Sequence, residues 1–265
     1  MGIPKPQNQD VFIINPSILS QKFMSFFAVC DGHGSEGHLV SGMIKSNFIK
    51  LLEKNLTSSN PSQALTKSIN EINDLVLGCK IDSEFSGSTF VGVLIHGDQL
   101  YCANVGDSAA VIGSFCGNWG LVKLSEEHNP LRQDEANRII ANGGRIGCHV
   151  KGGPLRIWYI DENIPGLAMT RSIGDKASRV IGLIGEPEMY YRKLTKNDKF
   201  LIIASDGLWE FIDYKEAVNI VGEMVVAGKS ELSCAKLLRE ALERWSCNSM
   251  SVDDITIIVV FLSVN

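Results

Sequence analysis

The acidic residues of this sequence gather where apolar, β-branched runs begin or end. Three aspartates follow such a run and two precede one: Asp31 after MSFFAVC, Asp107 after LYCANVG, Asp206 after KFLIIAS, Asp253 before ITIIVVFL and Asp10 before VFII. In an antiparallel sheet the end of one strand lies beside the start of its neighbour, so these side chains can converge on one edge. Clustered carboxylates repel one another unless a cation lies between them. Oxygen ligands of this kind favour Mg²⁺ or Mn²⁺ over zinc.

A metal site at such an edge has a definite chemistry. Gly32 and Gly207 follow two of the aspartates, and glycine allows tight turns and the close approach of backbone carbonyls. Each Asp-Gly pair is by itself an ordinary turn signal, and the combination is what points to a cluster. Two ions about 3.5–4 Å apart can activate a water and grip a phosphate. The pattern therefore predicts phosphoester hydrolysis, without choosing the substrate.

The elements that must position these residues are short strands and paired helices. Predicted strands cover residues 11–15, 24–30, 88–97, 99–106, 109–115, 120–124, 199–205 and 255–264. The Gly97-Asp98 dipeptide between two of them favours a tight hairpin, and the short connections favour antiparallel pairing. Apolar stripes predict helices after His38, over 65–76, over 134–141, over 215–227 and over 231–245. The class is therefore α+β, with helices outside an antiparallel sheet or sandwich.

The composition narrows the function further. The chain has 265 residues and a net charge of −5, so it lacks the basic footprint of a nucleic-acid-binding protein. Its apolar runs are shorter than the ~20 residues needed to span a bilayer, and residues 1–10 lack the apolar core of a signal peptide. The seven cysteines are scattered without a CxxC pair, which favours a reducing compartment. We therefore expect an intracellular protein, cytoplasmic or nuclear, without a membrane span.

The motifs together resemble the PPM, or type 2C, metal-dependent protein phosphatases. FFAVCDGHGSEGH, SGSTFVGVLI, YCANVGDSAAVI, LAMTRSIGD, FLIIASDGLWEFI and SVDDITIIVV occur in that family's order, over nearly the whole chain. The resemblance implies one domain over residues 1–265, cut from a longer polypeptide or complete. It implies a central antiparallel β-sandwich flanked by antiparallel helix pairs (α-β-β-α), with an irregular flap subdomain at about 147–185. It also implies a monomer that hydrolyses phosphoserine and phosphothreonine in phosphoprotein substrates.

The resemblance assigns roles residue by residue. It implies two Mg²⁺ or Mn²⁺ ions, and a weaker third, that activate a bridging water. Asp31 resembles the aspartate that bridges both metals, and the Gly32 carbonyl a ligand of one. Asp206 and Asp253 resemble ligands of the other ion, and Asp107 resembles a residue linked to the weaker third ion. Asp10 matches an acid that hydrogen-bonds metal-bound water. His33 resembles the general acid, and Lys5 matches a residue that contacts phosphate. His33 suits its role because imidazole titrates near neutral pH.

Several positions depart from the family pattern without removing a core ligand. Lysine at position 5 replaces a more usual arginine, and therefore supplies charge without the bidentate fork. The other departures are Gln9 for an acid, Ala109 for an arginine, Glu210 for an aspartate and Asp254 for an asparagine. They keep open the alternative of a pseudophosphatase that acts as a binding module. A metal-dependent nuclease is a third hypothesis, which the acidic net charge disfavours.

Other polar and aromatic residues receive structural interpretations. Trp209 is interpreted as core packing rather than a substrate platform. His38, His96, His128 and His149 lack paired metal-ligand spacing and are interpreted as surface or turn residues. Arg171 and Arg179 are interpreted as solvated charges, with substrate phosphate as the alternative.

Overall fold

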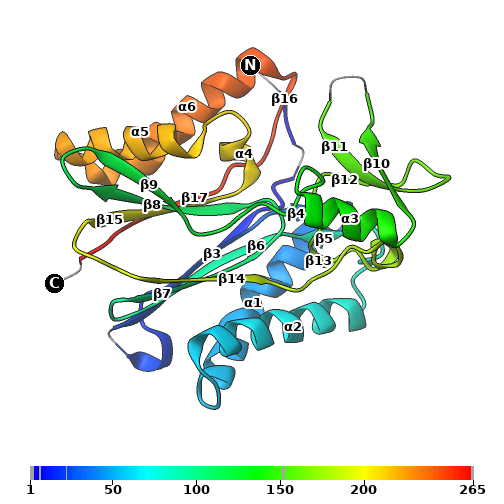
Figure 1. Cartoon of the computed structure of the whole chain (residues 1–265), viewed down its shortest axis with the longest axis horizontal. Helices are drawn as coiled ribbons and strands as arrows, with labels where there is room; N and C mark the ends of the chain where they lie inside the picture. The colour runs from blue at the N-terminus through cyan, green and yellow to red at the C-terminus, as the bar shows by residue number, and fades with distance from the viewer. Residues whose placement is uncertain (1–2, 6, 22, 151–152, 264–265) are drawn as a thin grey trace.

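Two antiparallel sheets lie face to face at the centre of the molecule (Figure 1). The computed structural model describes residues 3–5, 7–21, 23–150 and 153–263. The five-stranded sheet has the order β14 (Glu188–Lys193), β7 (Gln99–Val105), β6 (Phe90–His96), β3 (Met24–Cys30) and β2 (Val11–Asn15). The four-stranded sheet has the order β17 (Ile257–Phe261), β15 (Asp198–Ala204), β8 (Ala109–Phe115) and β9 (Trp119–Lys123).

A helix pair covers the outer face of each sheet (Figure 1). Helices α1 (Gly37–Leu56) and α2 (Pro61–Gly78) cover the five-stranded sheet, and α5 (Tyr214–Val226) and α6 (Ser233–Asn248) cover the four-stranded one. Asn60 caps α2 by accepting the Gln63 N–H, and Asp213 caps α5 by accepting the Glu216 N–H. This arrangement confirms the predicted α-β-β-α sandwich of the α+β class.

Three apolar layers hold these four layers of secondary structure together. Under α1 and α2, the rings of Phe26, Phe48 and Phe90 pack with centroids 4.6–6.4 Å apart. A second layer lies between the sheets, where residues such as Val93 and Ile203 are fully buried. A third lies between the four-stranded sheet and α5 and α6. Removal of this apolar surface from water is the main favourable term in folding.

Smaller elements build out from one end of the sandwich. A three-stranded sheet of β4 (Gly32–His33), β5 (Gly87–Ser88) and β13 (Ile173–Gly174) places β5 between the other two. A second small sheet contains β10 (Gly144–Cys148), β11 (Leu155–Tyr159) and β12 (Pro165–Leu167), beside α3 (Gln133–Ala141). The remaining elements are β1 (Ile3–Pro4) paired with β16 (Ser251–Val252), α4 (Asp206–Trp209) and the 3₁₀ turns Ile18–Ser20, Lys176–Ile181 and Ser230–Leu232.

The long apolar strands and the helices lie where the sequence predicts them, and the Gly97-Asp98 hairpin joins β6 to β7. The sequence patterns missed β14 and the strands β10 to β13. Most side chains of β14 are exposed, so the run has no buried apolar alternation to detect. The sheet of β10, β11 and β12 begins at Gly144 and supplies regular structure within the segment 147–185, which was expected to be irregular. Val264 of the last predicted strand, and Lys151 and Gly152 of the expected flap, lie outside the described residues.

Buried charges attach α3 to the segment that leads into β13. Glu135 is fully buried and accepts hydrogen bonds from Arg138 at 2.6 Å, from Arg171 at 2.8 Å and from the Thr170 hydroxyl. Burial alone would raise the pKa of Glu135, but the hydrogen bonds from the two arginines and Thr170 hold that pKa far below its ordinary value. Arg171 is therefore a structural ion-pair partner, and its interpretation as a solvated charge was wrong.

Glu135→Gln should lower the free energy of unfolding by about 3–5 kcal/mol, because it leaves buried guanidinium groups without their counter-charge. Glu126→Gln is the matched control, since Glu126 forms an exposed pair with Lys123 and should change stability by less than about 1 kcal/mol. Urea denaturation of both variants measures the difference. Equal stabilities would show that the buried network does not hold α3.

Candidate active site

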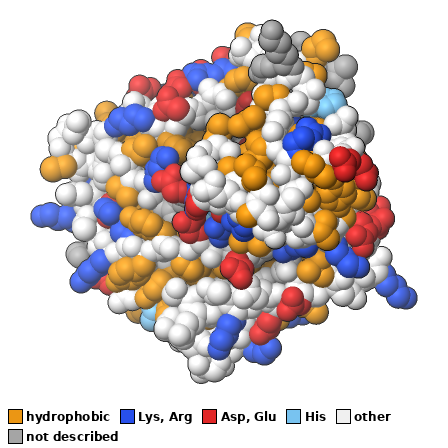
Figure 2. All heavy atoms as spheres, turned by 45° about the vertical axis from the view of Figure 1, so that its right-hand side comes forward, with side chains coloured by type: hydrophobic (Ala, Val, Ile, Leu, Met, Phe, Trp, Pro, Cys, Tyr) orange, Lys and Arg blue, Asp and Glu red, His pale blue; other side chains and the backbone are white. Residues whose placement is uncertain are grey.

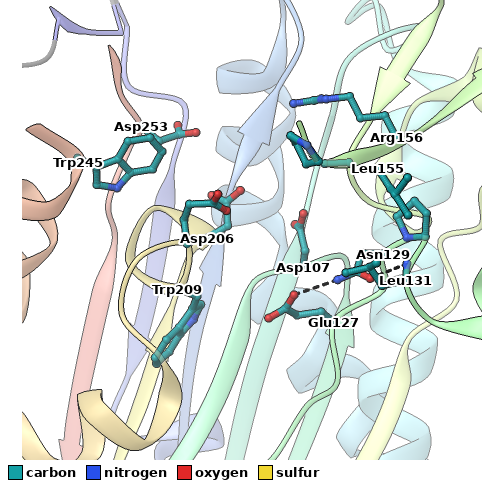
Figure 3. Close-up of a pocket in the computed structure, with 14 residues that line it drawn as sticks. Asp107, Glu127, Asn129, Leu131, Leu155, Arg156, Asp206, Trp209, Trp245 and Asp253 are labelled. Atoms are coloured by element: carbon teal, nitrogen blue, oxygen red, sulfur yellow. Dashed lines mark hydrogen bonds between the residues drawn. The ribbon is translucent and has the colours of Figure 1, made fainter. Parts of the chain in front are cut away.

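The predicted aspartates converge at one edge of the sandwich. Asp107, Asp206 and Asp253 line an open cavity of about 360 Å³, to which Arg156 and the rings of Trp209 and Trp245 also contribute. Figure 3 shows Asp206 and Asp253 on one side of this cavity, Asp107 at its centre and Arg156 reaching over it from β11. The convergence that the strand ends predict is therefore present.

Asp31 and Asp107 are the two buried carboxylates of this set. Burial, followed by the charges of Asp206, Asp10 and Asp107, raises the pKa of Asp31 well above its ordinary value. Burial first, and then the charges of neighbouring acids, raise the pKa of Asp107 to about 8. Burial is also the main cause that raises the pKa of Asp206 to about 6. Without a cation among them, each of these groups ionises less readily than an ordinary aspartate.

Backbone contacts fix Asp31 at the end of β3. The Asp31 N–H donates to the Thr89 hydroxyl at 3.0 Å, and the Thr89 N–H donates to the Asp31 carbonyl at 2.9 Å. Gly32 follows, and a Cβ at that position would lie 2.6 Å from the carbonyl oxygens of Gln9 and Gly37. Any side chain at position 32 would therefore push these segments apart, so the close packing requires glycine.

Two of the positions that depart from the family pattern, 9 and 254, are in contact through the backbone of Gln9. The Asp254 carboxylate accepts the Gln9 N–H at 2.9 Å, and the Gln9 side chain donates to the Gly34 carbonyl at 2.8 Å. Next to them, one oxygen of Asp10 accepts the Ser205 hydroxyl at 2.8 Å. Asp254 thus secures the segment that carries Asp10. The extra acid has a structural partner in the chain itself.

Lys5 lies against the acidic cluster. Its ammonium group forms an ion pair with Asp253. Burial alone would lower the pKa of Lys5, but the hydrogen bond and charge of Asp253, with the charges of Asp31 and Asp254, raise it. Lys5 therefore neutralises part of the negative charge at this edge.

The donor set fits hard divalent cations. Asp10, Asp107 and Asp206 each have a buried carboxylate oxygen, Oδ1, that lacks a hydrogen-bond partner among the described residues. Buried polar atoms normally have partners, so three unpaired oxygens in one place call for a ligand. In the described ranges of the chain, no group of three or more His, Cys, Asp or Glu side chains is already arranged to hold a metal ion. Mg²⁺ does not need such a group, because it usually combines one or two carboxylates with several waters.

His33 has a buried carboxylate as its partner. Its Nε2 lies 2.6 Å from Oδ2 of Asp175, and Oδ2 also accepts the Ser172 hydroxyl at 2.5 Å. Burial alone would lower the pKa of His33, but the charge and hydrogen bond of Asp175 raise it. The pairing of β4 with β5 and of β5 with β13 brings the two residues together. A Cβ on Gly87 in β5 would lie 2.2 Å from Asp175 Oδ2, so the pair requires glycine there.

Sequence patterns alone did not identify Asp175, which belongs to the LAMTRSIGD motif, nor the scaffolding role of Thr89.

Two interpretations drawn from the sequence were wrong. His128 is fully buried rather than a surface or turn residue, because its ring accepts the Gly106 N–H and contacts Glu188. Arg179 is not a solvated charge: its guanidinium donates to the carbonyls of Ser172 and Gly174 and to Asn73.

Trp209 packs in the core, as predicted, and also lines the cavity. Its indole N–H donates to the Ala204 carbonyl at 2.9 Å, and its ring packs against the apolar layer under α5 and α6. The same residue lines the cavity, below Asp206 in Figure 3. His96 and His149 are exposed, as expected for surface residues, and His38 is partly buried.

The distribution of charge on the surface bears on possible partners. On the face that Figure 2 shows, Lys and Arg side chains are interspersed with Asp and Glu and do not form one continuous basic field. A nucleic-acid-binding face would carry clustered positive charge. Among the described residues, no helix has the length and apolar character needed to cross a membrane.

Comparisons with known proteins agree with this geometry. The family described as protein phosphatase 2C matches residues 5–250. The chain is 33% identical to "Probable protein phosphatase 2C 35" of Arabidopsis thaliana, over 97% of this chain and 79% of that protein. It is 35% identical to "Probable protein phosphatase 2C 41" of the same plant, over 96% of this chain and 78% of that protein.

Solved structures share the fold at lower sequence identity. A serine-threonine phosphatase 2C from Toxoplasma gondii superposes with a TM-score of 0.86 at 22% identity, over 98% of this chain and 92% of that chain. A C. elegans sex-determining protein superposes with a TM-score of 0.81 at 23% identity, over 99% of this chain and 63% of that chain. The α-β-β-α sandwich is therefore common to these proteins.

Asp206→Asn should stabilise the metal-free protein and weaken its response to Mn²⁺. The variant removes one of several mutually repelling buried charges, which we expect to raise the free energy of unfolding by about 1–3 kcal/mol. Mn²⁺ at about 100 times its Kd should add about 2.7 kcal/mol to the wild type and less to the variant. Urea denaturation with and without Mn²⁺ measures both effects, with the exposed Asp161→Asn as control. A wild type that Mn²⁺ does not stabilise would contradict the proposed donor set.

Proposed function

The chain belongs to the protein phosphatase 2C family, the metal-dependent serine/threonine protein phosphatases, and on that premise we propose how its residues carry out the reaction. The substrate is a phosphoserine or phosphothreonine side chain of a protein, which enters the cavity lined by Asp107, Asp206 and Asp253. The observation that carries the proposal is the set of buried oxygens on Asp10, Asp107 and Asp206 that have no hydrogen-bond partner in the described ranges, together with the buried Asp31.

Four aspartates and one carbonyl would hold the cations, and a fifth aspartate would orient a water. Asp31 would bridge two Mg²⁺ or Mn²⁺ ions, with the Gly32 carbonyl on one of them and Asp206 and Asp253 on the other. Asp107 would hold a weaker third ion, and Asp10 would orient a water beside the pair. When bound, the ions activate a water for attack and offset the negative charge that develops on the phosphoryl oxygens.

His33 would protonate the leaving group. When water oxygen bonds to phosphorus, the bond from phosphorus to the serine or threonine oxygen breaks, and the departing alkoxide takes a proton from the imidazole. The Asp175 carboxylate, 2.6 Å from Nε2, favours the protonated imidazole that this step consumes. Ser172 and the buried position of Asp175 keep the pair in place.

Lys5 would contact the phosphate once a cation satisfies Asp253. In the structure its ammonium group pairs with that carboxylate. A cation on Asp253 would compete for the same oxygens, and the lysine charge would then be available to an incoming dianion. A single ammonium group gives charge without the fixed two-point geometry of arginine.

We further propose that residues 1–265 act as one domain and as a monomer, with a flap of about residues 147–185 at the cavity. The position of Leu155 and Arg156 in the cavity lining supports the flap assignment. Asp254, one of the two departures that keep the pseudophosphatase alternative open, has a structural partner in the Gln9 N–H. A nucleic-acid substrate is disfavoured by the net charge of −5.

A metal-dependence assay tests this function. We expect hydrolysis of a phosphothreonine peptide only when Mn²⁺ or Mg²⁺ is present, and a loss of at least about 100-fold in kcat/KM for Asp206→Asn. The exposed Asp161→Asn variant should retain wild-type activity. Full activity of Asp206→Asn would refute its assigned role. Absence of both turnover and Mn²⁺ binding in the wild type would restore the pseudophosphatase hypothesis.

The role of His33 is tested by changing the leaving group. His33→Ala should lower kcat on a phosphothreonine peptide by about 10²–10⁴-fold, because its alkoxide leaves poorly without a proton. The loss on 4-nitrophenyl phosphate should be much smaller, since that phenolate is a good leaving group. His96→Ala, an exposed histidine on β6, is the matched control. An equal loss on both substrates would mean that His33 does not supply the proton.

A further inference from the structure

His128 joins segments that bear on the site without lining the cavity itself. It lies in the loop between β9 and α3 and has no exposed surface. Its backbone N–H donates to the Gly106 carbonyl at 3.0 Å, and its carbonyl accepts the Thr170 N–H at 2.8 Å. Gly106 directly precedes Asp107, and Thr170 begins the segment that leads to Asp175.

The imidazole ring makes a second contact with the same glycine. Gly106 donates its N–H to His128 Nδ1 at 3.1 Å, so the two residues are connected by hydrogen bonds in both directions. Gly106 has a φ of +106°, and a Cβ there would lie 2.7 Å from the Thr89 side chain. The turn is therefore enclosed between His128 on one side and Thr89, which holds Asp31, on the other.

The opposite side of the ring fixes its tautomer. His128 Nε2 lies 2.9 Å from the Glu188 carboxylate on β14, and Glu188 also pairs with Arg132 at 2.6 Å. A carboxylate accepts hydrogen bonds, so Nε2 carries the proton and Nδ1 is left as the acceptor for Gly106. Burial first, and then the charge of Arg171, lower the pKa of His128 to about 4, which keeps the ring neutral.

We propose that His128 is a positioning residue for the reaction: its Nδ1 fixes the Gly106 turn and thereby aims the Asp107 carboxylate into the cavity. Asp107 needs such support because it is buried, lines the cavity and has an oxygen without a hydrogen-bond partner in the part of the chain that the structure describes. The inference rests on the proposed function, in which Asp107 holds the weaker cation.

The competing explanation is that His128 only fills space, and two substitutions separate the explanations. In His128→Asn the side-chain amide oxygen stands the same number of bonds from Cβ as Nδ1, so it can accept the Gly106 N–H. In His128→Gln the amide stands one bond further out, near the place of Nε2, so it can reach Glu188 but not serve Gly106. If His128 only fills space, His128→Asn should be the more harmful change, because asparagine is smaller and loses the contact with Glu188. If His128 positions Asp107 through Nδ1, His128→Gln should be the more harmful change.

The experiment titrates Mn²⁺ into the full chain by calorimetry and measures hydrolysis of 4-nitrophenyl phosphate against Mn²⁺ concentration. We expect His128→Gln to weaken the weakest Mn²⁺ binding step by about 10–100-fold, as loss of a group that orients a ligand usually does. The half-saturating Mn²⁺ concentration should rise in parallel, with an unchanged KM for the phosphate ester. His128→Asn should stay within about 3-fold of the wild type in both measurements.

Each outcome decides the proposal. Equal effects of the two substitutions, or a larger effect of His128→Asn, would overturn the positioning role of His128. The proposed function would still stand in that case, provided that the wild type binds Mn²⁺ and hydrolyses the ester. If His128→Gln does not fold, the Asn variant alone suffices, since a loss of 10-fold or more in Mn²⁺ affinity would contradict positioning through Nδ1. A wild type that neither binds Mn²⁺ nor hydrolyses the ester would overturn both proposals.

Discussion

The arrangement depends on keeping several carboxylates close together at one edge of the sandwich against their mutual repulsion. Isolated carboxylates of this kind would separate or take up protons, as the raised pKa values of Asp31, Asp107 and Asp206 indicate. The chain resists separation because Asp31, Asp107 and Asp206 follow β3, β7 and β15, which are buried in the apolar layers. The free energy that holds the acids together therefore comes from apolar burial elsewhere in the sandwich. A bound cation converts the same repulsion into attraction.

Local hydrogen bonds then determine where each carboxylate points. Strand ends alone place a residue to within a few ångströms, which is too coarse for a metal site. The finer placement comes from groups that are not acidic: Thr89 holds Asp31 at both its N–H and carbonyl, and Ser205 donates to Asp10. Glycines allow these segments to approach, as at Gly32, where any Cβ would meet two backbone carbonyls. The site is thus made by small residues as much as by the acids.

The sequence predicts the sandwich and the meeting of the aspartates because both follow from local patterns. Buried strands such as β3 and β8 are continuous apolar runs, and an acid at the end of such a run is visible without a structure. The partners of those acids are a different matter. Asp175 meets His33 only because β5 lies between β4 and β13, and neither residue's neighbours in the sequence reveal that pairing.

Polar residues were the least predictable for the same reason. His128 and Arg171 lie in segments with no apolar period, so sequence reasoning placed them at the surface, although long-range partners bury them. The exposed strand β14, which supplies Glu188 to His128, was missed for lack of a buried alternation. A polar residue's burial depends on where its counter-charge folds to, and a single sequence does not contain that information.

The part of the molecule around α3 is held by ion pairs as well as by apolar burial. Its own apolar cluster centres on only a few residues, Ile139, Ile157, Ile181 and Leu183. Glu135 secures Arg171 and Thr170, and a few residues further on Ser172 and Asp175 secure His33. One short segment is therefore anchored to α3 at its start and to the proposed general acid at its end. The position of His33 consequently depends on the ion pairs of α3 as well as on the sandwich, because a segment this short has little slack to absorb a displacement.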